Sequence, residues 1–138
     1  NLTAAWLVTR ACLPLLKQAS DASIVFTTAD VGRQGRAYWG AYGVAAFGLE
    51  GMVQIFAEEL AAWPKLRVNS IDPGNVRTTM RAKVYPGEDP NIHPLPEEIV
   101  ASYLYLLGPD SRRLTGRGFR AQRGNKPPLE SVNPVNLL

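Results

Sequence analysis

Apolar residues recur along this chain with two different periods, and these periods predict alternating helices and strands. Residues 2–18 and 40–62 carry apolar side chains at helical spacing, and a third helix is predicted from residue 96 to residue 107. Short apolar runs predict strands at residues 22–28 and 66–71, with a last short strand within 115–122. This order is typical of an α/β fold, here half of a doubly wound parallel sheet with about three strands.

The same periods predict which side chains the helices and strands bury. In the first helix we expect Thr9 to face away from the apolar stripe, Cys12 to be a small buried residue and Pro14 to introduce a kink. The strand at 66–71 is expected to alternate between its two faces. The stripes predicted for the first and third helices consist of Trp6, Leu7, Ala11, Leu15 and Leu16, and of Ile99, Val100, Tyr103, Leu104 and Leu107.

Two stretches lack a regular period. From Asp72 to about Pro96 the chain is rich in proline and glycine, and loops of this length are usually functional lids or disordered segments. After a folded unit at residues 1–122, prolines make regular structure improbable in 123–138, which is predicted to be an irregular tail.

Composition excludes several classes of protein. A hydrophobic content of 46% with 20% charged residues is ordinary for a globular domain, and a single cysteine excludes an internal disulfide. No apolar run reaches the ~18 residues of a membrane span, and no signal peptide is recognisable, so a cytoplasmic location is expected. The net charge of +3 comes from scattered arginines without interleaved aromatic residues, so a nucleic-acid partner is not predicted.

The candidate chemistry is centred on the segment that joins the first strand to the second helix. A buried strand, a glycine-bearing loop and a long helix make half of a βαβ unit, in which ligands bind beyond the carboxyl end of the strand. Tyr42 lies in the first turn of this helix, with its hydroxyl expected to face that crevice. The alternative is that Tyr42 only packs against the strand.

Residues 24–57 resemble the active-site segment of the short-chain dehydrogenases/reductases: a strand, a turn of the form Ser-x-x-Gly, then Tyr-x-x-x-Lys at the start of a helix. Further stretches are similar to the same family, and one of them resembles its YciK-like branch of bacterial oxidoreductases. These are Asn1-Leu2-Thr3, the run Val68–Thr78 with Pro73-Gly74, and, for the branch, Asp110–Gly116 with Ala121-Gln122 and Lys126-Pro127.

The resemblance implies a Rossmann-type sheet and a hydride transfer between NAD or NADP and a carbonyl or alcohol substrate. Tyr42 would then move the proton, and Asn1 would anchor a water that relays it. Positions in the nicotinamide loop would contact the cofactor; these are Pro73, Gly74, Val76 and Thr78. In this family the helices that correspond to 2–18 and 40–62 commonly form a dimer interface, so a homo-oligomer is expected.

The departures from the family pattern concern its catalytic residues. Ala29 stands at the serine position and Ala46 at the lysine position, and no Gly-x-x-x-Gly-x-Gly loop for the pyrophosphate occurs in the sequence. We therefore expect the carboxyl-terminal half of an NAD(P)-dependent oxidoreductase that is inactive as it stands. The alternative is a non-catalytic scaffold or oligomerisation subunit.

The remaining polar candidates have simpler interpretations. His93 has no carboxylate or cysteine at metal-ligand spacing and is interpreted as a solvated loop residue, so no metal site is predicted. Arg33 and Arg36 are interpreted as residues of an exposed loop, and the alternative is that they meet an anionic ligand.

Overall fold

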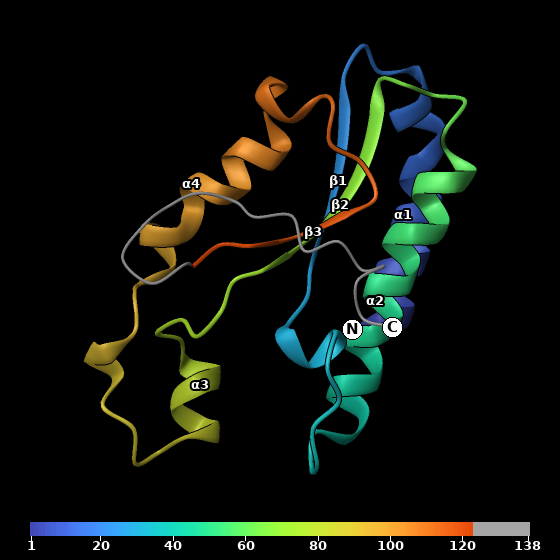
Figure 1. The fold of residues 1–138 in the computed structure, drawn as a ribbon. Helices are drawn as coiled ribbons and strands as arrows, with labels where there is room; N and C mark the ends of the chain where they lie inside the picture. Colours follow the sequence, from blue (N-terminus) through green and yellow to red (C-terminus); the bar gives the residue numbers. More distant parts are fainter. Residues whose placement is uncertain (123–138) are drawn as a thin grey trace.

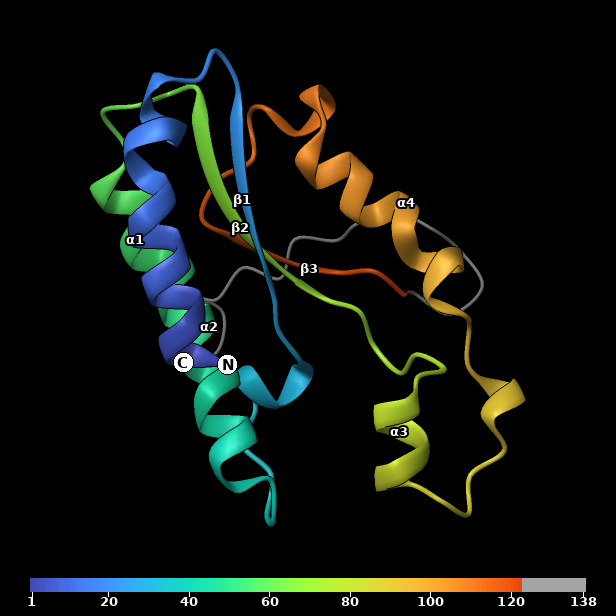
Figure 2. The same cartoon turned by 180° about the vertical axis from the view of Figure 1, so that it is seen from behind.

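The computed structural model describes residues 1–122. They form a parallel sheet in the order β1-β2-β3, from β1 (Ala22–Thr27), β2 (Leu66–Asp72) and β3 (Arg117–Arg120). Its helices are α1 (Leu2–Gln18), α2 (Gly40–Glu59), α3 (Thr79–Val84) and α4 (Pro96–Leu107). Helices α1 and α2 lie together on one face of the sheet, and α4 lies on the other (Figures 1 and 2). The predicted α/β order and parallel sheet are confirmed.

Alternate residues of β1 serve the two faces of the sheet. Ala22 and Phe26 belong to the core beneath α1 and α2. On the opposite face the Ser23 hydroxyl donates to the Leu106 carbonyl of α4 at 2.8 Å, and the Thr27 hydroxyl lies 3.3 Å from the Tyr103 hydroxyl. This is the period of two that a strand between two helical layers requires.

The larger core fills the space between the sheet and the α1–α2 pair. Phe56 of α2 is 1% exposed and stacks between Trp6 and Phe26, with ring centroids 5.3 and 6.4 Å away. Gly48 permits the close packing of α1 on α2, because a Cβ at this position would lie 2.6 Å from Leu2 Cδ2. A smaller core lies under α4 and comprises Ile71, Leu106 and Phe119.

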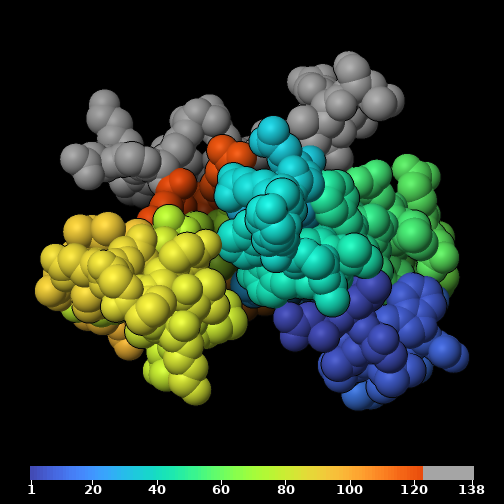
Figure 3. Space-filling model, turned by 90° about the horizontal axis from the view of Figure 1, so that it is seen from below, coloured from blue at the N-terminus to red at the C-terminus, as the bar shows by residue number. Residues whose placement is uncertain are grey.

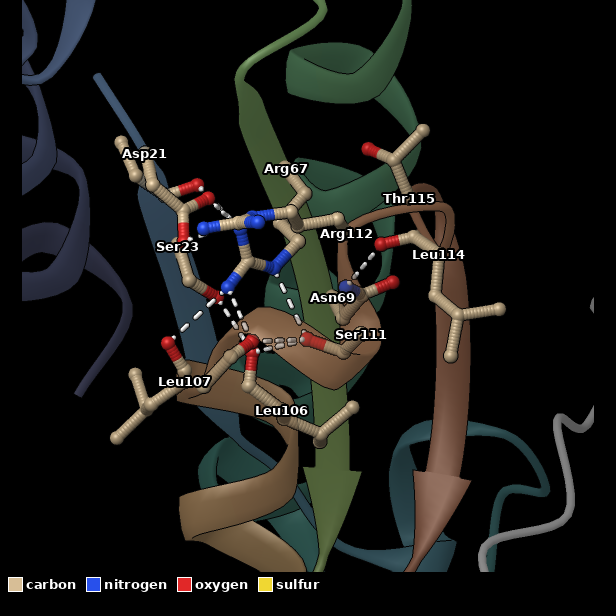
Figure 4. A network of polar contacts seen from close by, with 12 residues as sticks. Asp21, Ser23, Arg67, Asn69, Leu106, Leu107, Ser111, Arg112, Leu114 and Thr115 are labelled. Atoms are coloured by element: carbon tan, nitrogen blue, oxygen red, sulfur yellow. Dashed lines mark hydrogen bonds and ion pairs between the residues drawn. The ribbon is translucent and has the colours of Figure 1, made fainter. Parts of the chain in front are cut away.

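Strand β2 alternates between its two faces as expected, with Val68 in the larger core and Ile71 in the smaller one, and it is buried at all seven positions. Both faces of this central strand are covered, and its polar side chains are therefore paired within the protein. Arg67 donates hydrogen bonds to Asp21, Ser111 and the last carbonyls of α4, and Asn69 donates to the Leu114 carbonyl at 2.7 Å (Figure 4).

The predicted helices occur, but their buried stripes differ from the expectation. In α1, Thr9 is 6% exposed, whereas Leu15 is 72% exposed and Cys12 is also exposed. In α4 the buried residue is Leu106, and Leu104 is 63% exposed. Each helix carries apolar residues around more than one face, so periodicity alone could not decide which face meets the sheet. The exposed residues that were expected to be buried also include Leu7, Val100 and Leu107.

One further expectation is corrected by the observed elements. Helix α1 is continuous through Pro14, and the kink expected there stays a prediction. The stretch from Asp72 to Pro96 contains a short helix, α3, and a 3₁₀ turn at Pro90–Ile92, so it is more ordered than predicted. The proposed tail at 123–138, with Lys126 and Pro127, lies outside the described residues. Within residues 1–122, no helix combines the length and the apolar character needed to cross a membrane.

Candidate active site

A cavity of about 570 Å³ opens beyond the carboxyl ends of β1 and β2, a size typical of small-molecule sites. The end of β1 and the start of α2 form one wall of the cavity, and α3 with the loop before it forms the other. The region around the start of α2 and the region around α3 adjoin in the space-filling view (Figure 3). Its lining includes Thr28, Ala29, Asp30, Tyr38, Trp39, Tyr42, Asp72, Pro73, Gly74, Asn75, Val76, Thr78, Met80, Arg81, Val84 and Tyr85.

Tyr42 lines this cavity from the first turn of α2 and is 39% exposed. Its ring packs at a tilt of 49° on Trp39, with centroids 5.6 Å apart. Partial burial raises the pKa of its phenol, and the carboxylates of Asp72 and then Asp30 raise it further. Both charges that act on the phenol are negative, whereas a catalytic tyrosine needs a cation that stabilises its phenolate.

The two alanine positions supply neither a hydroxyl nor a charge. Ala29 lines the cavity at the end of β1. Ala46 is 5% exposed and packs against the η1 turn (Asp30–Gly32), where a Cβ on Gly32 would lie 2.9 Å from the Ala46 Cβ. The neighbouring Thr28 hydroxyl donates to the Ala46 carbonyl at 3.5 Å. The Thr28 hydroxyl is therefore directed to α2 and does not supply the hydroxyl that the family pattern has at position 29.

Asp72 is a residue of this cavity that sequence reasoning missed. It ends β2, is only 7% exposed, and accepts a hydrogen bond from the Gly74 N–H at 2.8 Å. Burial raises the pKa of its carboxyl, and the Gly74 N–H and the charge of Arg33 lower it. The charge of Asp30 raises it and that of Arg120 lowers it to a smaller extent. The alternation of side chains along β2 could have indicated its position. Asp72 lies two residues after Ser70 and therefore on the same face of the strand, and the Ser70 hydroxyl donates to Glu50 of α2 at 2.8 Å.

The predicted cofactor-contact residues all lie in the cavity wall. Pro73, Gly74, Val76 and Thr78 follow β2 directly. Gly74 adopts a φ of +70°, which a residue with a side chain rarely adopts, and the Gln122 amide donates to the Pro73 carbonyl at 2.7 Å. The loop is thus held by a side chain from beyond β3.

Asn1, the second predicted catalytic residue, does not line the cavity. It is exposed and occupies the position before α1, where its side chain makes no capping hydrogen bond. Of the two, only Tyr42 lies at the cavity.

The loop that closes one side of the site is fastened by charged groups. Arg81 of α3 makes two hydrogen bonds to Glu88, at 2.6 and 2.8 Å, and His93 Nε2 lies 3.0 Å from the same carboxylate. Arg81, followed by His93, lowers the pKa of Glu88 to about 2. His93 is therefore not a solvated loop residue, because its side chain is 11% exposed and faces a carboxylate.

Two arginines interpreted as exposed also take part in contacts. The Arg33 side chain is 9% exposed; it donates to Glu50 at 3.0 Å and to the Phe119 carbonyl at 3.3 Å, which ties the loop after β1 to α2 and β3. Arg36 pairs with Asp30 at 2.5 Å on the surface. No group of three or more potential metal ligands occurs within residues 1–122.

The parallel sheet, the crevice beyond its strand ends and the tyrosine on the first turn of α2 are the features of a dinucleotide-linked oxidoreductase site. The family model described as short chain dehydrogenase matches residues 1–89, and the chain belongs to this family.

The chain is similar to the YciK branch of that family. The oxidoreductase YciK of Escherichia coli K12 is 50% identical over 127 residues, which cover 92% of this chain and 50% of YciK. A short chain dehydrogenase structure from Salmonella enterica serovar Typhi superposes with a TM-score of 0.85 at 49% identity, covering 88% of this chain and 50% of that one. A structure from Escherichia coli CFT073 in complex with NADPH gives a TM-score of 0.84 at 49% identity, over 88% of this chain and 50% of that chain. The chain thus spans about half the length of these relatives.

Proposed function

We propose that this chain is the carboxyl-terminal segment of an NAD(P)-dependent short-chain oxidoreductase whose acid–base site is disabled. The observation that carries the proposal is the electrostatic environment of Tyr42. The charged groups that shift its pKa are the carboxylates of Asp72 and Asp30, and they raise it, whereas the cation of the family pattern is replaced by Ala46.

The expected fraction of phenolate and the missing hydroxyl donor support a loss of acid–base catalysis in both directions of the reaction. An unperturbed phenol, with a pKa near 10, is only about 0.1% phenolate at pH 7, and here the shift is upward, so Tyr42 is a poor base for oxidising an alcohol. For reduction of a carbonyl, the developing alkoxide would lie near two carboxylates. It would also lack a hydroxyl donor at Ala29, and removal of one such donor typically costs about 10²–10³ in rate.

The residues present do not fit a whole nicotinamide dinucleotide. The loop Pro73–Thr78 offers a wall of suitable size for the nicotinamide end. Ala46 provides no cation for the ribose, and no glycine-rich loop for the pyrophosphate occurs in the sequence. We therefore expect this chain by itself to bind neither NADH nor NADPH, and we assign no step to the cofactor.

Two measurements test the proposal. Titration of the 138-residue chain into NADPH, followed by cofactor fluorescence, is expected to show no saturable binding; millimolar or tighter affinity would contradict it. A chimaera with the amino-terminal half of Escherichia coli YciK then supplies a cofactor loop. This chimaera is expected to be inactive towards a panel of ketones and to gain NADPH oxidation only when it carries Ala29→Ser and Ala46→Lys. Carbonyl-dependent NADPH oxidation by the unsubstituted chimaera would overturn the proposal, as would turnover by the doubly substituted 138-residue chain alone.

The second candidate is a scaffold subunit that assembles through the helices at 2–18 and 40–62. The observation that favours it is the apolar surface that α1 and α2 leave uncovered, including Val8 at 63%, Leu15 at 72% and Val44 at 70% exposure. Gly48 is not available for such a contact, because Leu2 of the same chain already occupies its surface. Sedimentation equilibrium is expected to show a dimer or larger species for the chain, and a Leu15→Glu, Val44→Glu variant is expected to be monomeric; a monomeric unsubstituted chain would exclude this candidate.

A further inference from the structure

We propose that the cavity beside Tyr42 binds an organic cation, a ligand that carries an ammonium group. This inference rests on the proposed function in one respect: with Ala46 in place of the lysine, the catalytic end of the cavity holds no resident ammonium. The new claim concerns what the cavity accepts, and it is carried by the charges and rings on its walls.

The first observation is a buried carboxylate that no side-chain cation neutralises directly. Asp72 lines the cavity, is 7% exposed and takes part in no ion pair among residues 1–122; its hydrogen bond from the Gly74 N–H engages only one of its two oxygens. A carboxylate in this position is stabilised by a ligand cation that enters the cavity, because opposite charges attract strongly where water is excluded.

The other charges on the cavity wall are already compensated. Asp30 pairs with Arg36 at 2.5 Å. Arg81 is bound by both oxygens of Glu88 and by the side-chain oxygen of Asn75 at 2.8 Å. These pairs leave Asp72 as the charge of the lining that has no ion-pair partner among residues 1–122. The charges of Arg33 and Arg120 act on it without an ion pair, so its sign still favours a ligand cation.

The second observation, independent of the carboxylate, is the aromatic character of the walls. The lining contains Tyr38, Trp39, Tyr42 and Tyr85, with Trp39 and Tyr42 tilted against each other at a centroid distance of 5.6 Å. Such rings attract cations through their negative faces, and tryptophan does so most strongly. Tyr38 is held at a φ of +69°, an unfavourable conformation for an aromatic residue, and it is fully exposed at the cavity rim. A carboxylate together with aromatic faces is the combination that recognises alkylammonium groups.

Two probes of nearly equal shape separate charge from size. Choline and its neutral carbon analogue 3,3-dimethylbutan-1-ol are titrated into the 138-residue chain by calorimetry. We expect choline to bind at least about tenfold more tightly than the neutral alcohol. Equal affinity for the two probes, or binding of neither, overturns the inference.

Substitutions then locate the site. Asp72→Asn is expected to weaken choline binding about tenfold or more, whereas Glu59→Gln removes an equal charge from an exposed position of α2 and is expected to leave it unchanged. Trp39→Leu keeps the carboxylate and is expected to weaken choline binding severalfold. If the circular dichroism spectrum of Asp72→Asn shows that this variant is misfolded, Trp39→Leu tests the site in its place. Unchanged binding in both cavity variants overturns the inference.

These outcomes are separable from those of the proposed function. Ketone reduction by the unsubstituted chimaera contradicts the loss of catalysis but does not alter the preference between the two probes. Equal binding of the probes overturns the cation site and does not restore a catalytic group at position 29 or 46.

Discussion

Replacing Arg67 by methionine is expected to remove a large part of the stability of the described fold. This arginine is the second residue of β2 and is 2% exposed. A guanidinium has five N–H donors, and the structure provides an acceptor for each of them (Figure 4). The five acceptors are Ser111 Oγ at 2.9 Å, Asp21 Oδ1 at 2.5 Å, and the carbonyl oxygens of Ala22 at 3.3 Å, Leu107 at 3.0 Å and Gly108 at 2.7 Å.

The size of the effect follows from what these acceptors would lose. The Gly108 carbonyl would keep the Ser111 hydroxyl at 3.1 Å, and Asp21 would keep Arg112 at 3.3 Å. The Leu107 carbonyl, at the end of α4, would lose its side-chain donor. Removal of one member of a buried charged network typically costs about 3–5 kcal/mol, against a total of roughly 5–15 kcal/mol for a domain. Methionine keeps the apolar volume of the stem, so the loss reports the guanidinium.

Urea unfolding of the 138-residue chain, followed by far-ultraviolet circular dichroism, measures this loss. Arg67→Met is expected to lower the midpoint by about 1 M or more, given slopes of about 1–3 kcal/mol/M. Arg67→Lys is expected to be intermediate, because a single ammonium cannot reach acceptors on both sides of the strand.

Arg112→Met is the matched control. Arg112 contacts the same Asp21 carboxylate, but its side chain is 62% exposed, and exposed pairs contribute little. Its midpoint is expected to stay close to that of the unsubstituted chain. If Arg67→Met and Arg112→Met unfolded at the same urea concentration, the assignment of the stability to the buried guanidinium would be refuted.

Three further predictions concern the cavity and its lid. Ala46→Lys is expected to lower the pKa of Tyr42, because a cation one helical turn away stabilises the phenolate. The pKa is measured by absorbance at alkaline pH, with the signal of the matching Tyr42→Phe variant subtracted. An unchanged pKa would show that the two side chains do not interact. Because the pKa of Asp72 is raised in the folded state, its contribution to the free energy of unfolding is present below its unfolded pKa and is lost as pH rises through the folded pKa. Asp72→Asn is therefore expected to have a higher melting temperature than the unsubstituted chain at pH 7 but not at pH 3. The same difference in melting temperature at both pH values would contradict this sign. Glu88, whose pKa is lowered to about 2, holds Arg81 at neutral pH, so Glu88→Gln is expected to speed amide exchange across residues 77–93, with Glu97→Gln as the exposed control; equal exchange in the two variants would show that the carboxylate does not fasten this loop.

Elements could be predicted where local pattern decides the structure. The strand before Ala29 and the helix that carries Tyr42 were predictable because a short β-branched run and a long helical period have few alternative structures. The face that each helix buries was less predictable. Thr9 is buried and Leu104 is exposed because the sheet covers only part of an apolar helix surface, and its position depends on the whole packing.

The candidate site divides in the same way. The position of Tyr42 in the first turn of its helix and the alanines at positions 29 and 46 follow from spacing along one strand–loop–helix segment, and the sequence determines them. That Asp72 acts on the same phenol depends on the parallel pairing that brings the ends of β1 and β2 together.

The sequence by itself thus determined the α/β order, the family membership and the alanines at two positions of the family pattern, because each is encoded within a single segment. Only the tertiary structure decided that the cavity is acidic and aromatic, that His93 faces Glu88 and that Arg67 joins β1 to α4. Those contacts join residues that are distant in sequence or meet across a folded loop, so they exist only once the elements have packed.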